Sequence, residues 1–323
     1  MTSPRRFAAL DLGSLTVRLA VAEGLTAGKF RVLVQRREVT GLGRGLAATG
    51  ELAPAGMVRT LEALKDFQQV MAAHQVEVYR AVGTQALRQA ANRQVFLDRV
   101  REALGLAVEV LAPEEEARLS LAGVLSVLHP EVLAAPAVLV FDVGGGSSEF
   151  ALVRPGAATV FASLPLGVLT LSQARPLGDP PIPEKVAALK AELAARLGVF
   201  YHETIRPHLE ADPHLVGTAG AVTTLAAMHV KLRPYDPDKI NHLTLTRDQV
   251  AALAEQMARL PEAERAKLSG MEPAKAGVMV AGALIVLTIL EVCRQDSLVV
   301  IDAGLLEGVL QDMAPKFSVS RSG

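Results

Sequence analysis

Two segments of the chain carry the residue types expected of a phosphate-binding turn. Residues 7–23 read FAALDLGSLTVRLAVAE and residues 139–153 read LVFDVGGGSSEFALV, each an apolar run that reaches an aspartate and then glycine and serine. Consecutive backbone N–H groups in such a turn can bind phosphate oxygens, and glycine lets the backbone approach the anion closely. Because a carboxylate repels phosphate, we expect Asp11 and Asp142 to hold Mg²⁺, directly or through water.

The two turns differ in how strongly they indicate an anion site. Taken alone, DLGS at residues 11–14 fits an ordinary hairpin turn better. The second turn, at residues 144–146, has three successive glycines inside a strand pattern, which cost stability and therefore need a reason. The recurrence of one plan at domain-scale separation favours a functional role for both turns.

A third segment, LVGTAGAVTTLA at residues 215–226, runs from a strand through Gly217, Thr218 and Gly220 directly into a helix. The N-terminus of a helix offers free N–H groups and the positive end of the helix dipole to an anion. A tight strand-to-helix connection with no ligand explains the same pattern equally well.

Alternating strands and helices must position these turns, which predicts an α/β protein. Apolar spacing predicts helices over residues 57–73, 88–104 and 184–202. Because the two β-turn-β segments each open a unit, we expect two domains that face each other across a cleft. The predicted first domain comprises residues 1–122 and 303–323, and the second comprises residues 123–302.

Composition describes a well-packed globular chain with no global charge. Of the 323 residues, 50% are hydrophobic and 21% are charged, and the net charge is −1. This balance predicts neither nucleic acid nor an anionic membrane as partner, and the absence of tryptophan gives little support to a base-stacking platform. A single cysteine, Cys293, and an N-terminus without a signal-peptide pattern favour the cytoplasm.

The longest apolar run, residues 277–290, is shorter than the roughly 20 residues of a membrane span. We predict a buried helix there, with a membrane span as the alternative. No zinc spacing such as HExxH and no GxxxxGK[ST] loop occurs in the sequence.

Together, the three segments resemble the phosphate-1, phosphate-2 and adenosine motifs of the actin-like ATPase superfold. Finer matches in the same order along nearly the whole chain resemble the exopolyphosphatase/guanosine pentaphosphate phosphohydrolase family. They are DLGSLTVRL at 11–19, VGTQALRQA at 82–90, EEARLSLAGV at 115–124, DVGGGSSEF at 142–150, SLPLGVLTL at 163–171 and IDAGLLEGVL at 301–310. The resemblance implies two ribonuclease-H-like domains of the actin/Hsp70/sugar-kinase type.

The resemblance also implies one catalytic carboxylate. Pro113 followed by three acids is by itself typical of a helix N-terminus, where acids complement the dipole. The acid directly before Ala-Arg-Leu, Glu116, corresponds to the general base of the family, which activates water for attack on a terminal phosphorus.

The remaining site residues follow from the same phosphoryl-transfer logic. Arg18 and Arg88 match basic positions that the family uses near phosphate, although surface solvation is the common role of an arginine. For Glu149 the alternative is an ordinary outward-facing strand residue. The expected phosphate ligands are Gly13, Ser14, Arg18, Arg88, Gly144, Gly145, Gly146 and Ser147, and the expected metal ligands are Asp11, Asp142 and Glu149, for Mg²⁺ or another divalent ion.

The family resemblance leaves the substrate open between inorganic polyphosphate and guanosine pentaphosphate. Lys275 stands where relatives carry an arginine, which removes a forked donor and weakens the case for alarmone recognition. We predict an exopolyphosphatase, with pentaphosphate hydrolysis as the alternative. An ATP-using kinase or ATPase and a non-catalytic sensor are less favoured, and a homodimer is left open.

Overall fold

The computed structural model describes residues 5–25 and 29–317 and separates into two compact units. Unit 1 comprises Met1–Ser126 and Ala303–Gly323, and unit 2 comprises Val127–Asp302. The chain first passes from unit 1 to unit 2 after residue 126, whereas the sequence predicted this boundary after residue 122. Residues 318–323 of the predicted first domain lie outside the described residues.

Unit 1 is built on a five-stranded sheet of order β3-β2-β1-β4-β5, in which β1 pairs antiparallel with β2 and parallel with β4. Its strands are β1 (Arg6–Leu12), β2 (Thr16–Gly24), β3 (Phe30–Val39), β4 (Val78–Gly83) and β5 (Val108–Val110). Its helices are α1 (Leu46–Thr49), α2 (Pro54–Ala73), α3 (Gln85–Gln89), α4 (Arg93–Leu104), α5 (Pro113–Val127) and α13 (Leu305–Met313), and a 3₁₀ turn (Ala314–Phe317) follows α13.

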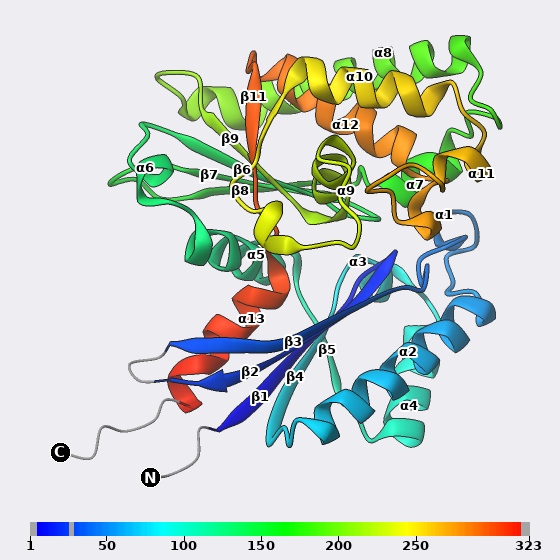
Figure 1. The fold of residues 1–323 in the computed structure, drawn as a ribbon, viewed down its shortest axis with the longest axis vertical. Helices are drawn as coiled ribbons and strands as arrows, with labels where there is room; N and C mark the ends of the chain where they lie inside the picture. The colour runs from blue at the N-terminus through cyan, green and yellow to red at the C-terminus, as the bar shows by residue number, and fades with distance from the viewer. Residues whose placement is uncertain (1–4, 26–28, 318–323) are drawn as a thin grey trace. The chain divides into compact units, whose positions relative to one another are not determined.

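The apolar strand β1 contributes side chains to the cores on both faces of the sheet, because successive side chains point to opposite sides. Ala8, Leu10 and Leu12 lie in a core with α2 and α4, whereas Phe7 and Ala9 lie in a second core with α13. Figure 1 shows α2 and α4 on one side of this sheet and α13 on the other. Asp11 belongs to the same alternate set as Phe7 and Ala9, which directs it to the α13 side.

Close backbone packing joins α5 to the start of α13. A Cβ atom added at Gly123 would overlap the carbonyl of Gly304, and one added at Gly308 would overlap the carbonyl of Leu119. Only glycine fits these two positions without a backbone shift. The C-terminal segment around Gly304 and Gly308 therefore packs directly against α5, backbone to backbone.

Unit 2 holds a six-stranded sheet of order β10-β11-β9-β6-β7-β8, with β11, β9 and β6 parallel. Its strands are β6 (Val138–Val143), β7 (Ser148–Val153), β8 (Val160–Leu164), β9 (His214–Thr218), β10 (Thr244–Thr246) and β11 (Ser297–Val300). Its helices are α6 (Pro130–Leu133), α7 (Val168–Ala174), α8 (Pro183–Phe200), α9 (Ala219–His229), α10 (Arg247–Ala258), α11 (Glu262–Arg265) and α12 (Met279–Val292), with a π-helical turn (Tyr201–Ile205) and 3₁₀ turns at Arg206–His208, Pro237–Lys239 and Pro273–Lys275.

The apolar run predicted as a buried helix is α12, whose residues 279–290 are all buried. It packs against α8, α9 and α10 in unit 2. No helix within residues 5–25 and 29–317 is long and apolar enough to cross a membrane. The apolar run was predicted to be helical from residue 277, whereas α12 begins at Met279, after the 3₁₀ turn Pro273–Lys275.

The predicted helix over residues 88–104 is wrong as a single element. The chain forms α3, breaks at residues 90–92, and resumes as α4. Asn92 explains the break, since its side-chain amide exchanges hydrogen bonds with the backbone of Leu52, at 2.8 Å to the N–H and 3.1 Å to the carbonyl. The break leaves Arg88 on a short helix of its own, directly after β4.

Candidate active site

The first glycine turn joins β1 to β2 in unit 1. The Gly13 N–H donates to the Thr16 carbonyl at 3.0 Å, and a Cβ atom at Gly13 would lie 2.9 Å from that same oxygen. Ser14 is buried, and its hydroxyl donates to the Gln85 side chain at 3.3 Å. The turn is thereby tied to α3, the helix that carries Arg88.

Asp11 and Arg18 are register partners across the β1–β2 hairpin. The Arg18 Nε and Nη2 atoms donate to Asp11 Oδ2 at 3.0 and 2.8 Å, whereas Oδ1 is buried without a hydrogen-bond partner. Asp11 is only 5% exposed, and a buried polar atom without a partner costs free energy. Asp11 therefore presents one oxygen suited to an additional positive ligand.

Glu116 lies in the first turn of α5 and is 8% exposed. Arg88 forms an ion pair with its Oε2 atom and also donates from Nη1 to the Leu111 carbonyl at 3.0 Å. Leu111 directly follows β5, in the short connection that leads into α5. One guanidinium thus fixes both the start of α5 and the carboxylate that the sequence assigned as general base.

Sheet topology explains why these residues meet. β1, β4 and β5 are parallel neighbours, so their carboxyl ends share one edge of the sheet, the usual place for ligand sites in α/β proteins. The residues that unit 1 gathers near this edge are Asp11, Gly13, Ser14, Arg18, Gln85, Arg88 and Glu116.

Sequence reasoning missed a second glycine segment in unit 1, GLGRG at residues 41–45. The Gly43 N–H donates to the Ser14 carbonyl at 2.8 Å, and the Gly41 N–H donates to the Leu15 carbonyl at 2.9 Å. Gly41 and Gly45 have φ angles of 62° and 81°, which favour glycine. Three glycines within five residues were the available signal. These hydrogen bonds hold the segment against the turn that contains Ser14. The Arg44 side chain is exposed.

The second glycine turn, in unit 2, has its peptide oxygens directed at the start of α7. The Gly144 carbonyl accepts from Val168 at 3.0 Å, and the Gly145 carbonyl accepts from Leu169 at 2.8 Å. The Thr170 hydroxyl donates to the Gly146 carbonyl at 3.2 Å. In a trans peptide the N–H points opposite to the C=O, so the N–H groups of residues 145–147 point away from α7. Three consecutive N–H groups on one side of a turn form an anion cradle.

The two carboxylates predicted as metal ligands in unit 2 lie side by side. Asp142 on β6 is the register partner of Glu149 on β7. Glu149 is buried, which removes the alternative of an outward-facing residue, and its Oε1 accepts from the Ser163 hydroxyl at 3.0 Å. A hydrogen bond of this kind orients the carboxylate next to the glycine turn.

Strand β9 runs directly into α9, as the sequence predicted, with Gly217 and Thr218 at the end of the strand and Gly220 in the first turn of the helix. The residue between the last two, Ala219, adopts a φ angle of 68°, which is unusual for a residue with a Cβ atom. Lys275 is 2% exposed, and its Nζ would lie 3.0 Å from a Cβ at Gly220. The lysine forms an ion pair with Glu272 at 2.8 Å, so its charge is engaged beside this turn.

No group of three or more His, Cys, Asp or Glu side chains suited to a metal ion occurs within residues 5–25 and 29–317. Mg²⁺, however, keeps several waters and takes one or two carboxylates together with substrate oxygens, so a protein cage is not required. The unpartnered Oδ1 of Asp11 fits such a role. The donor set is compatible with Mg²⁺ and lacks the thiolate or imidazole groups that zinc prefers.

Each of the two units is an α/β sheet that carries a glycine turn beside an aspartate, so the predicted α/β class with two domains is confirmed. The Ppx/GppA phosphatase family model matches residues 21–317, and the chain belongs to that family. Exopolyphosphatase 2 of Mycobacterium tuberculosis is 31% identical over 321 residues, covering 96% of this chain and 98% of the relative.

Solved structures agree with this assignment. The crystal structure of the Aquifex aeolicus member of the Ppx/GppA family superposes with a TM-score of 0.78 at 34% identity, covering 98% of this chain and 100% of that one. An exopolyphosphatase from Cytophaga hutchinsonii gives a TM-score of 0.83 at 25% identity, covering 97% and 98%. The family predicted from the sequence motifs is therefore confirmed.

Proposed function

We propose that this protein is a Mg²⁺-dependent exopolyphosphatase that releases orthophosphate from the end of inorganic polyphosphate. Relatives named exopolyphosphatase cover almost the whole chain at 31% identity, which supports hydrolysis of a phosphoanhydride bond. The observation that carries the proposal is the Glu116 carboxylate, buried and paired with Arg88 next to Ser14 and Asp11 in unit 1.

Glu116 acts as general base in this proposal. A water oxygen attacks the terminal phosphorus, the water proton passes to the Glu116 carboxylate, and the bond to the bridging oxygen breaks. The products are orthophosphate and a chain shortened by one unit. Arg88 and Arg18, both held by acids in the absence of substrate, neutralise charge on the phosphoryl oxygens.

The glycine turns position the substrate. Ser14 in unit 1 and the N–H groups of residues 145–147 in unit 2 would each donate to phosphate oxygens, and hydrogen bonds within its own unit already fix each turn. The carboxylates that would hold Mg²⁺ are Asp11 within unit 1, and Asp142 with Glu149 within unit 2. When bound, Mg²⁺ would neutralise part of the charge on the phosphoryl oxygens.

Guanosine pentaphosphate is the alternative substrate, since it presents a similar terminal phosphoryl group. Lys275 favours polyphosphate, because a lysine in place of an arginine offers no forked contact to a guanosine polyphosphate. A kinase or ATPase of the same fold would need an acceptor or ATP as its substrate. A cytoplasmic location belongs to the same proposal.

Phosphate release from polyphosphate, guanosine pentaphosphate and ATP, with and without Mg²⁺, tests this function. We expect release from polyphosphate to require Mg²⁺ and to fall at least ~10²-fold in Glu116→Gln, the scale of a lost general base. Glu114→Gln is the matched control, since Glu114 lies in the same helical turn but is exposed. Preferential release from pentaphosphate would transfer the proposal to that substrate, and inertness toward all three would reject hydrolysis.

A further inference from the structure

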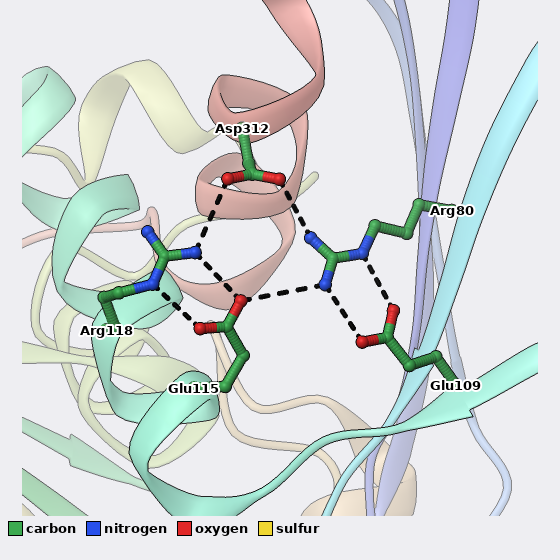
Figure 2. A network of polar contacts seen from close by, with 5 residues as sticks. All are labelled: Arg80, Glu109, Glu115, Arg118 and Asp312. Atoms are coloured by element: carbon green, nitrogen blue, oxygen red, sulfur yellow. Dashed lines mark hydrogen bonds and ion pairs between the residues drawn. The ribbon is translucent and has the colours of Figure 1, made fainter.

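Five charged side chains from four elements form one ionic network in unit 1 (Figure 2). Arg80 on β4 contacts Glu109 on β5 through two hydrogen bonds of 3.0 and 3.1 Å. Arg118 on α5 contacts Glu115, also on α5, through two hydrogen bonds of 2.8 Å. Asp312 on α13 receives Arg80 at 3.1 Å and Arg118 at 3.4 Å.

The network is closed rather than a row of separate pairs. Glu115 lies 3.7 Å from Arg80 as well as in contact with Arg118, and Asp312 bridges the same two arginines. Isolated surface pairs contribute little, but forked arginine contacts and networks are the geometries in which such pairs matter. The side chain of Arg80 is the most buried of the five, at 22% exposed.

The network holds the helical turn that carries Glu116. Glu115 precedes Glu116 directly, and consecutive helical residues are about 100° apart around the axis, so the two carboxylates leave the helix in different directions. Glu115 reaches Arg80, and Glu116 reaches Arg88. Both arginines belong to one stretch of chain, since α3 follows β4 directly.

We infer that Arg80, through Glu115 and Asp312, is a positioning residue for Glu116. The β4–α3 segment contacts the first turn of α5 through two ion pairs. Arg88 pairs with Glu116, the proposed base, and Arg80 pairs with its neighbour Glu115. A rigid turn keeps the Glu116 carboxylate where the attacking water must be oriented, and small displacements of a catalytic group are costly. This inference rests on the proposed function, in which Glu116 is the base.

A purely structural role makes a different prediction. If the network only fastens α13 to the sheet, loss of Arg80 lowers the unfolding temperature and leaves turnover of the folded enzyme unchanged. If it positions Glu116, kcat falls while KM stays within about twofold, because substrate binding does not use Arg80. The two roles therefore separate in steady-state kinetics measured well below the unfolding temperature.

The experiment compares Arg80→Ala and Arg80→Lys in the full-length protein with polyphosphate as substrate. We expect kcat to fall at least about tenfold in Arg80→Ala, and Arg80→Lys to recover part of the loss by keeping the charge without the fork. Arg175→Ala is the control, because it removes a comparable pair with Glu192 in unit 2, at 2.8 and 3.3 Å. An unchanged kcat in Arg80→Ala would overturn the inference.

Hydrogen exchange separates this inference from the proposed function. In Arg80→Ala we expect faster amide exchange in a peptide covering residues 113–118, with no change there in Arg175→Ala. If the wild type releases no phosphate, the proposed function fails, yet exchange still reports whether Arg80 holds this turn. Unchanged exchange in that peptide would reject the positioning role regardless of activity.

Discussion

Arg88 and Glu116, which the sequence assigns separate roles as phosphate ligand and general base, form an ion pair with each other. The same guanidinium donates to the Leu111 carbonyl at 3.0 Å. If Arg88 binds phosphate as proposed, a substrate would compete with Glu116 for its donors. The pair would then link substrate binding to the carboxylate that accepts the proton.

Substitution of Arg88 tests this link. Arg88→Ala removes both a phosphate donor and the partner of Glu116, so we expect a higher KM and a kcat lower by about 10- to 100-fold. Arg88→Lys keeps one positive charge and should retain part of the activity. Steady-state phosphate release checks both values. Arg101→Ala, at an exposed position on α4, is the control, and an equal loss there would point to a general effect.

Substitution of Asp11, the partner of Arg18, tests the proposed dependence of the reaction on Mg²⁺. Asp11→Asn keeps the size of the side chain but removes the charge beside the unpartnered Oδ1 atom. We expect the Mg²⁺ concentration for half-maximal activity to rise at least about tenfold, since a hard cation prefers carboxylate oxygen. Titration of Mg²⁺ during phosphate release gives this value. Asp66→Asn on α2 is the exposed control, and identical Mg²⁺ curves for Asp11→Asn and wild type would exclude Asp11 as a metal ligand.

Gly167 supports the second glycine turn by close backbone contact. A Cβ atom at this position would overlap backbone atoms of Gly145 and Gly146, which cannot move aside as a flexible side chain would. Gly167→Ala should therefore displace the turn and lower activity at least about tenfold. Gly198→Ala is the matched control, because nothing lies within 4 Å of its added Cβ in α8. That control should be neutral or stabilise by up to about 1 kcal/mol.

Glu115 predicts how the stability of unit 1 depends on pH. The hydrogen bonds from Arg118, followed by the charges of both arginines, lower the pKa of Glu115 below its ordinary value of 4.5, against the opposing effect of burial. A carboxyl whose pKa is lower in the folded state stabilises the fold above its unfolded pKa. That contribution is lost as the pH falls through the folded pKa.

The measurement compares the unfolding free energy of wild type and Glu115→Gln in urea. We expect the wild type to be the more stable protein at pH 7 and the difference to shrink below pH 4.5, where the carboxyl takes up its proton. High salt should reduce the difference at pH 7, since Glu115 is partly exposed and screened. A difference that grows toward acid pH would contradict the lowered pKa.

Local patterns were sufficient to predict much of this fold. The β-turn-β repeats around Asp11 and Asp142 and the long apolar run near α12 are contiguous in sequence, so period and composition reveal them. The break between α3 and α4 was missed because it depends on Asn92 bonding to Leu52, forty residues away. Helix propensity in a short window contains no information about such a partner.

In the candidate site, too, local motifs were predictable from the sequence, whereas contacts between distant residues were not. Motifs identified the acids and arginines but not their pairing, because the contacts of Arg18 with Asp11 and of Arg88 with Glu116 depend on strand register and on α5. The Gly41–Gly45 support of Ser14 and the approach of Asp312 to Arg80, 232 residues apart, arise only on folding. The metal and phosphate roles remain predictions that the substitutions above address.

The discontinuous origin of unit 1 has a consequence for biosynthesis. Phe7 and Ala9 are covered by α13, a helix translated almost three hundred residues after them. Residues 5–126 therefore leave the ribosome with one face of their sheet uncovered. This face stays uncovered until unit 2 and then α13 have been synthesised. We expect nascent chains that end before residue 305 to recruit chaperones through that face, and addition of the last helix to end the recruitment.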